Sequence, residues 1–168
     1  MREVVGRAVC AIAGDGELRR GVAVEKLRDA LVGLARGAAN DGMRGMVAKA
    51  MEAVCGDRKD ERRLPMLRDD VWDALAELGN AAGGDAIEAV CAAAASAISF
   101  WDTDPLNSFS SVAKMVLTAA QAAAGGDGLL VAAARALEAI VTVEGERGCE
   151  SVFETDAPIV STVVAMGR

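Results

Sequence analysis

Apolar residues recur along the chain at spacings of three and four, in stretches separated by glycine-rich breaks. In the stretch from Glu17 to Ala38, the large apolar residues fall at intervals that place them on one face of a helix. Gly14-Asp15-Gly16 precedes this stretch and Asn40-Asp41-Gly42 follows it, and both are sequences that typically end helices. The pattern therefore predicts an all-α fold of short helices joined by turns.

One pattern of small, charged and large residues occurs four times. Its copies begin at positions 6, 48, 92 and 134, so they are 42, 44 and 42 residues apart (48 − 6, 92 − 48 and 134 − 92). A period of about 40–47 residues is typical of helical repeats that stack into a solenoid. We expect one domain, with a long helix in each of four units. These helices should lie near Val4–Ala13, Met43–Cys55, Ala86–Phe100 and Leu129–Val143, in units at about 1–40, 41–83, 84–125 and 126–168.

After its long helix, each unit is expected to continue with a glycine-rich break and a pair of helices, of which the first is short. An arginine should open the short helix in three units, at Arg20, Arg63 and Arg147. In the second unit, Asp69 and Asp70 are expected to cap the next helix. In the fourth, residues 144–146 are expected to end the long helix.

Three helices per unit favour the armadillo repeat over the two-helix HEAT repeat, and the chain resembles the armadillo family over essentially its whole length. The motif behind the resemblance is small-x-small-large-x-x-large. It occurs as Ala134, Ala136, Leu137 and Ile140, and as Ala48, Ala50, Met51 and Val54. The resemblance implies a right-handed α-solenoid whose third helices line a concave groove that binds segments of other proteins.

The resemblance also indicates what this groove lacks. In peptide-binding members, the third helix presents a tryptophan and, four residues later, an asparagine that binds the ligand backbone. The corresponding first positions here are Arg7, Lys49, Ala93 and Arg135, and the second positions all carry alanine, at Ala11, Ala53, Ala97 and Ala139. Recognition of an extended basic peptide is therefore not expected.

The composition argues against several classes of function. A net charge of −7 and an isoelectric point near 4.7 argue against general nucleic-acid binding, which needs a basic surface. The chain has no histidine, the commonest general base, so we expect no catalysis. No cofactor or metal is expected, because the four cysteines (Cys10, Cys55, Cys91 and Cys149) lack the close spacing of a zinc or redox motif.

Most of the remaining candidates have simpler structural explanations. Three of the cysteines lie in or beside apolar runs and are expected to be reduced core residues, which points to a cytoplasmic protein. Trp72 is expected in the core, and Trp101 beside a turn. No apolar run reaches the roughly 18 residues of a membrane span. The opening residues look like the middle of a repeat, which leaves open whether the chain is a fragment of a longer protein.

Three function hypotheses follow. The first is a non-catalytic scaffold that binds a partner along the row Arg7, Lys49 and Arg135. Such a partner would be a protein with an acidic or phosphorylated segment, although the same row is equally explained as a solvated helix face. The second is a structural segment of a longer solenoid or cytoskeletal assembly. It is prompted by apolar end helices, at 4–12 and 159–166, that could self-associate. The third is a helical bundle that binds an apolar ligand.

Overall fold

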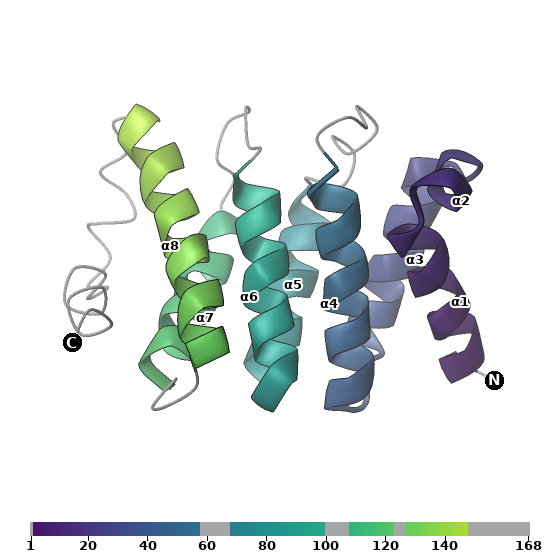
Figure 1. The fold of residues 1–168 in the computed structure, drawn as a ribbon, viewed down its shortest axis with the longest axis horizontal. Coiled ribbons are helices and arrows are strands. Elements are labelled where there is room, and N and C mark those ends of the chain that lie inside the picture. Colours follow the sequence, from purple (N-terminus) through teal and green to yellow (C-terminus); the bar gives the residue numbers. More distant parts are fainter. Residues whose placement is uncertain (1, 58–67, 100–107, 123–126, 148–168) are drawn as a thin grey trace.

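The computed structural model describes residues 2–57, 68–99, 108–122 and 127–147, and every regular element within these ranges is a helix (Figure 1). The predicted all-α class is therefore confirmed. In chain order the helices are α1 (Arg2–Gly14), α2 (Gly16–Arg20), α3 (Val24–Arg36), α4 (Asp41–Cys55), α5 (Asp69–Ala81), α6 (Gly84–Ile98), α7 (Ser108–Ala122) and α8 (Asp127–Arg147).

The helices form two layers. α1, α4, α6 and α8 pack side by side in that order in one layer, and α3, α5 and α7 do so in the other (Figure 1). The short α2 lies against α1. The first layer consists of the four long helices that the sequence period predicts, so consecutive copies of the pattern are neighbours in space.

Small residues let the helices of the first layer approach closely. Gly45 of α4 lies against Ala86 of α6, where a Cβ on the glycine would be 3.6 Å from the alanine Cα. α6 lies between α4 and α8, and ten of its fifteen residues are buried. Six of these ten are alanine, at positions 86, 89, 93, 94, 95 and 97. The other four buried residues of α6 are larger, namely Ile87, Val90, Cys91 and Ile98.

The second layer adds further large side chains to the core. α5 turns Val71, Trp72, Leu75 and Leu78 inward, and all four are at most 1% exposed. The expected core position of Trp72 is therefore confirmed, whereas Trp101 lies outside the described residues. Both layers contribute to one continuous core, since Met51, Ile98 and Leu137 of the first layer are also at most 2% exposed.

The N-termini of α4 and α6 are tied together through Asp41. Its carboxylate accepts hydrogen bonds from Arg44, at 2.8 Å, and from the backbone N–H of Gly83, at 3.3 Å. The hydrogen bond from Arg44, and to a smaller extent the one from Gly83, hold the pKa of Asp41 below its ordinary value. Gly83 precedes Gly84, whose φ of +50° favours glycine. The turn into α6 is thus fixed by its own glycine and by the preceding unit.

Three details of the predicted helices are wrong. α8 continues through residues 144–146 to Arg147, because a single glycine in a helix costs only about 1 kcal/mol and does not have to end it. Asp69 and Asp70 lie in the first turn of α5, where their negative charge interacts favourably with the positive end of the helix dipole, and the N-cap residue is Arg68. Arg20 and Arg147 do not open short helices, because they are the last residues of α2 and α8, and Arg63 lies outside the described residues.

Gly79 offers a test of how closely α5 and α7 pack. This buried glycine faces Met115, and an added Cβ would lie 3.1 Å from the methionine Cε and closer still to its Cγ and Sδ. We expect Gly79→Ala to lower the free energy of unfolding by about 1–3 kcal/mol, because the methionine must leave its position. Chemical denaturation measures the change.

Gly33 of α3 is the matched control, since a Cβ added there meets nothing within 4 Å. Gly33→Ala should raise the free energy of unfolding by about 0.5–1 kcal/mol, through helix propensity alone. A neutral Gly79→Ala would contradict the close contact between α5 and α7.

Candidate binding groove

A groove of about 800 Å³ runs over the first layer and is formed by α4, α6 and α8. Its lining combines charged rims with a floor of small residues: Lys49, Glu52, Asp85, Glu88, Ala89, Ala92, Ala95, Ser96, Gly128, Val131, Ala132 and Arg135. We call this surface the central groove. It lies on the row of helices that the sequence predicted as the binding surface.

The floor of the central groove belongs to α6. Ala92 and Ser96 are half-buried and Ala95 is almost fully buried, so no long side chain rises from the middle of the groove. The helices on either side carry longer residues, such as Glu52 on α4 and Val131 on α8. A floor of this kind lets a bound segment bring its backbone close to α6, as small residues do between packed helices.

Two of the three predicted binding residues line this groove, on the helices that flank α6. Lys49 of α4 and Arg135 of α8 are both exposed and both line the central groove. Arg7 lies outside this lining, on α1, where it donates a hydrogen bond to Glu3 one turn earlier at 2.7 Å. The structure therefore brings together Lys49 and Arg135 but not all three cations.

The internal alignment of the sequence placed Ala93 between these two cations. In the structure the residue between them is Ala92. α4, α6 and α8 begin at residues 41, 84 and 127, so the helices are offset by 43 (84 − 41 and 127 − 84). This offset makes Lys49, Ala92 and Arg135 equivalent. Ala92 lines the groove, whereas Ala93 is fully buried in the core.

Carboxylates share the central groove with the cations, which the sequence reasoning missed. Asp85 and Glu88 lie in the first two turns of α6, and Glu52 lies one turn beyond Lys49 on α4. The Glu88 carboxylate sits over the start of α8, where a Cβ on Gly128 would be 2.5 Å from one of its oxygens. The groove thus carries negative charge at both ends and positive charge in the middle.

The groove continues toward the N-terminal end of the stack. A second hollow of about 520 Å³ shares Lys49, Glu52 and Ser96 with the central groove and reaches Gly14, Arg19 and Asp57. It lies where α1 and α4 end and the short α2 begins. One surface therefore runs from α2 to α8.

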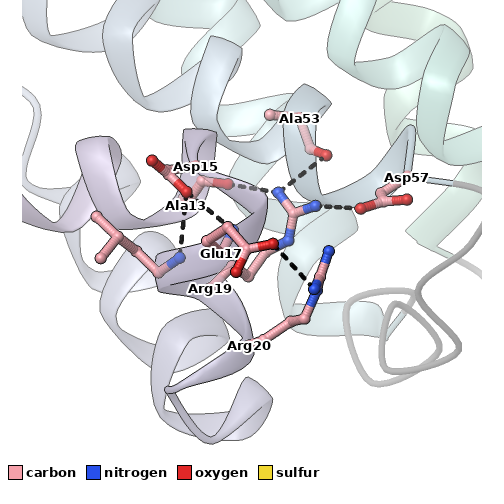
Figure 2. Close-up of polar contacts among 8 residues, drawn as sticks. Ala13, Asp15, Glu17, Arg19, Arg20, Ala53 and Asp57 are labelled. Carbon is pink, nitrogen blue, oxygen red and sulfur yellow. Dashed lines mark hydrogen bonds and ion pairs between the residues drawn. The ribbon is translucent and has the colours of Figure 1, made fainter.

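Arg19 joins three segments of chain beside this second hollow. Its side chain is buried, and its Nη1 donates to the backbone oxygens of Ala13, at 2.6 Å, and Ala53, at 3.4 Å (Figure 2). Its Nη2 donates to the carboxylate of Asp57 and forms an ion pair with it. Ala13 and Ala53 are near the C-termini of α1 and α4, where backbone carbonyls lack partners within the helix. The guanidinium therefore satisfies the ends of two neighbouring long helices at once.

The short helix that carries Arg19 is fixed by a side-chain cap. Asp15 accepts hydrogen bonds from the backbone N–H groups of Glu17, at 2.8 Å, and Leu18, at 3.1 Å (Figure 2). The neighbouring Arg20 points outward and pairs with Glu17 at the surface. The sequence reasoning placed Arg20 at the start of the short helix and did not identify Arg19, because the period alone cannot say which of two adjacent arginines turns inward.

The described residues include three buried cysteines and no cluster of metal ligands. They hold no group of three histidine, cysteine or acidic side chains placed to bind a metal ion. Cys10, Cys55 and Cys91 are buried free thiols, as predicted, and Cys149 lies outside the described residues. Burial raises the pKa of all three thiols, to about 12 for Cys55 and for Cys91, and this keeps them protonated and unreactive.

None of the helices in the described ranges combines the length and apolar character needed to cross a bilayer. Comparison of the chain with protein-family models, curated proteins and solved structures found no match.

Replacement of Arg19 tests its role as a joint between units. We expect Arg19→Met to lower the free energy of unfolding by about 2–3 kcal/mol, because two helix-end carbonyls and a partly buried carboxylate lose this donor. Arg20→Met should change it by less than about 1 kcal/mol, as is typical of exposed pairs. Thermal or urea unfolding gives both values. Equal effects of the two substitutions would show that Arg19 does not join the units.

The buried thiols predict a loss of stability at high pH. Cys55 and Cys91 keep their protons in the folded chain up to a pKa of about 12, whereas in the unfolded chain they ionise from about pH 9. The unfolded state therefore binds fewer protons above pH 9, and stability should fall as pH rises from 9 toward 12. The variant Cys55→Ala/Cys91→Ala should show a shallower fall over this range in urea titrations. An unchanged slope would contradict the burial of these thiols.

Proposed function

We propose that the chain is a non-catalytic protein-binding scaffold that holds a segment of a partner protein in the central groove. The observation that carries this proposal is the pair Lys49 and Arg135, set on opposite rims above a floor of small residues. The two-layer stack of equivalent helices supports its assignment as a right-handed, armadillo-like solenoid. The buried free cysteines support a reducing, cytoplasmic location.

The charges of the groove define the partner more closely than the sequence did. Two interhelical distances, about 20 Å in total, separate α4 from α8. An acidic or phosphorylated residue of the partner would lie between Lys49 and Arg135. Basic residues on the same segment would lie over Asp85 and Glu88. A helical segment suits this groove, because its width can meet both rims while its small-residue face rests on α6.

An apolar ligand is less well supported than a protein segment. Five of the twelve residues that line the central groove are charged, and its floor offers only small side chains. Small-molecule sites are usually enclosed and lined mostly by large apolar or aromatic residues. The charged rims instead favour a partner that is itself charged and elongated.

Selection from a displayed library of random peptides tests the proposal without a known partner. Peptides selected against the wild-type chain should carry acidic residues flanked, about one helical turn away, by basic residues. Fluorescence anisotropy should show that Lys49→Glu/Arg135→Glu weakens their binding by about tenfold or more, because two attractive contacts become repulsive. Their affinity should also fall as salt is added, since exposed charges are screened over about 8–10 Å.

Lys26→Glu/Lys114→Glu is the matched control. Both residues are exposed, both lie on the second layer, and the double reversal changes the net charge by the same amount. Binding should survive in this control. Peptides that bind equally well to Lys49→Glu/Arg135→Glu would overturn the assignment of the groove, and Arg7→Glu tests separately whether the binding row extends to α1.

A further inference from the structure

The charged side chains of the central groove differ from most others on the molecule in having no ionic partner. Six arginines outside the groove each form an ion pair with a carboxylate: Arg7, Arg19, Arg20, Arg28, Arg36 and Arg44. Within the described ranges, no ion pair or side-chain hydrogen bond is made by any of the five charged residues that line the groove: Lys49, Glu52, Asp85, Glu88 and Arg135. These five charges are therefore available to a bound segment.

The unpaired charges lie at different levels along α6. The two cations are at the level of Ala92, to which both are equivalent. Glu52 is equivalent to Ala95 (52 + 43), three residues or about 4.5 Å closer to the C-terminal end of α6. Glu88 and Asp85 precede Ala92 by four and seven residues (92 − 88 and 92 − 85), which is about 6 and 10 Å toward the N-terminal end. The groove thus presents two acids, then the cations, then one acid.

The three helices that form the groove run in the same direction (Figure 1). The hydrogen bond to Asp41 joins the start of α4 to the turn before α6, and Glu88 lies over the start of α8. The ends of α4 and α6 also meet, since a Cβ on Gly56 would be 3.8 Å from the Ser96 Oγ. The positive ends of the three helix dipoles therefore lie at the end of the groove that carries two acids.

We propose that the bound segment is a helix antiparallel to α6, with an acidic residue at the level of the cations and basic residues three positions before it and four and seven positions after it. This inference rests on the proposed function and adds a direction and a spacing to it. The basic residue before the acid meets Glu52, and the two after it meet Glu88 and Asp85. The pattern covers about three helical turns, as does the part of α6 that lines the groove, from Asp85 to Ser96.

The pattern is compatible with a single helix. At 100° per residue, its four charged positions fall within about 80° of one another, so all of them can point into the groove together. Small residues beside them can rest on the floor. The same spacing read in the opposite direction describes a parallel helix, so the charges alone leave two directions open.

Helix dipoles favour the antiparallel direction. An antiparallel segment places its negative C-terminal end over the positive starts of α4, α6 and α8, whereas a parallel segment places like ends together. The antiparallel pattern also puts two of the three basic residues in the C-terminal half of the segment, where cations stabilise a helix. The parallel pattern would put those two basic residues near the N-terminus, where they destabilise it.

A designed peptide tests the direction. The probe is an alanine-based helix with glutamate at its centre and lysine three positions before and four and seven positions after it. A peptide with the same residues in reverse order is the control, because it has the same composition and charge. Fluorescence anisotropy should show binding of the probe to the wild-type chain and at least about threefold weaker binding of the reversed peptide. Equal or tighter binding of the reversed peptide would overturn the antiparallel direction.

Charge swaps identify which residues meet. Glu52→Lys should weaken binding of the probe about fivefold, and a probe whose first lysine is replaced by glutamate should recover to within about twofold. Replacement of the lysine four positions after the central glutamate should rescue Glu88→Lys but not Glu52→Lys. Asp73→Lys, at an exposed residue of α5, is the matched control and should leave binding unchanged. Circular dichroism checks that each variant is folded. Rescue of Glu52→Lys by a change in the C-terminal half of the probe would contradict the proposed direction.

The outcomes separate this inference from the proposed function. Peptides selected from the display library could lose binding to Lys49→Glu/Arg135→Glu and yet lack this spacing, or the probe could fail to bind. Either result would refute the antiparallel pattern and leave groove binding intact. Selected peptides that bind independently of both cations would refute the two proposals together.

Discussion

Close approach of α4, α6 and α8 is the constraint on which the rest of the structure depends. It is possible because the contacting positions carry glycine and alanine, as at Gly45 and Ala86. The same small side chains that permit the approach also leave the floor of the central groove low, since Ala92 and Ser96 do not fill the space between the rims. Packing within the layer and the hollow on its surface therefore have one cause.

Polar contacts connect the units at both ends of the long helices. Asp41 ties the start of α4 to the turn before α6, and Arg19 ties the end of α1 to the end of α4. The first contact is exposed, whereas the second is buried and uses a guanidinium that reaches several acceptors. These contacts are directional, so they fix how one long helix is placed along its neighbour, which apolar packing between alanines specifies only weakly.

Much of this architecture could be predicted from the sequence, because the period and the apolar spacing are properties of the chain itself. Four long helices were predicted within a few residues of α1, α4, α6 and α8. The register within α6 was wrong by one residue, since a run of alanines at 92–95 offers no large side chain to mark the inward face. The burial of Arg19 and the carboxylates that share the groove with Lys49 depend on tertiary contacts that no local pattern records.

The central position of α6 has a consequence for how the molecule opens. In a row of helices that contact only their neighbours, local unfolding starts most easily at an end, where one contact is missing. Among the described helices, α1 has only α4 beside it in its layer, whereas α6 is held by α4 and α8 and backed by α5 and α7. Backbone amides of α6 should therefore exchange with solvent more slowly than those of α1. The floor of the groove would then keep its shape while the N-terminal end of the stack frays and re-forms.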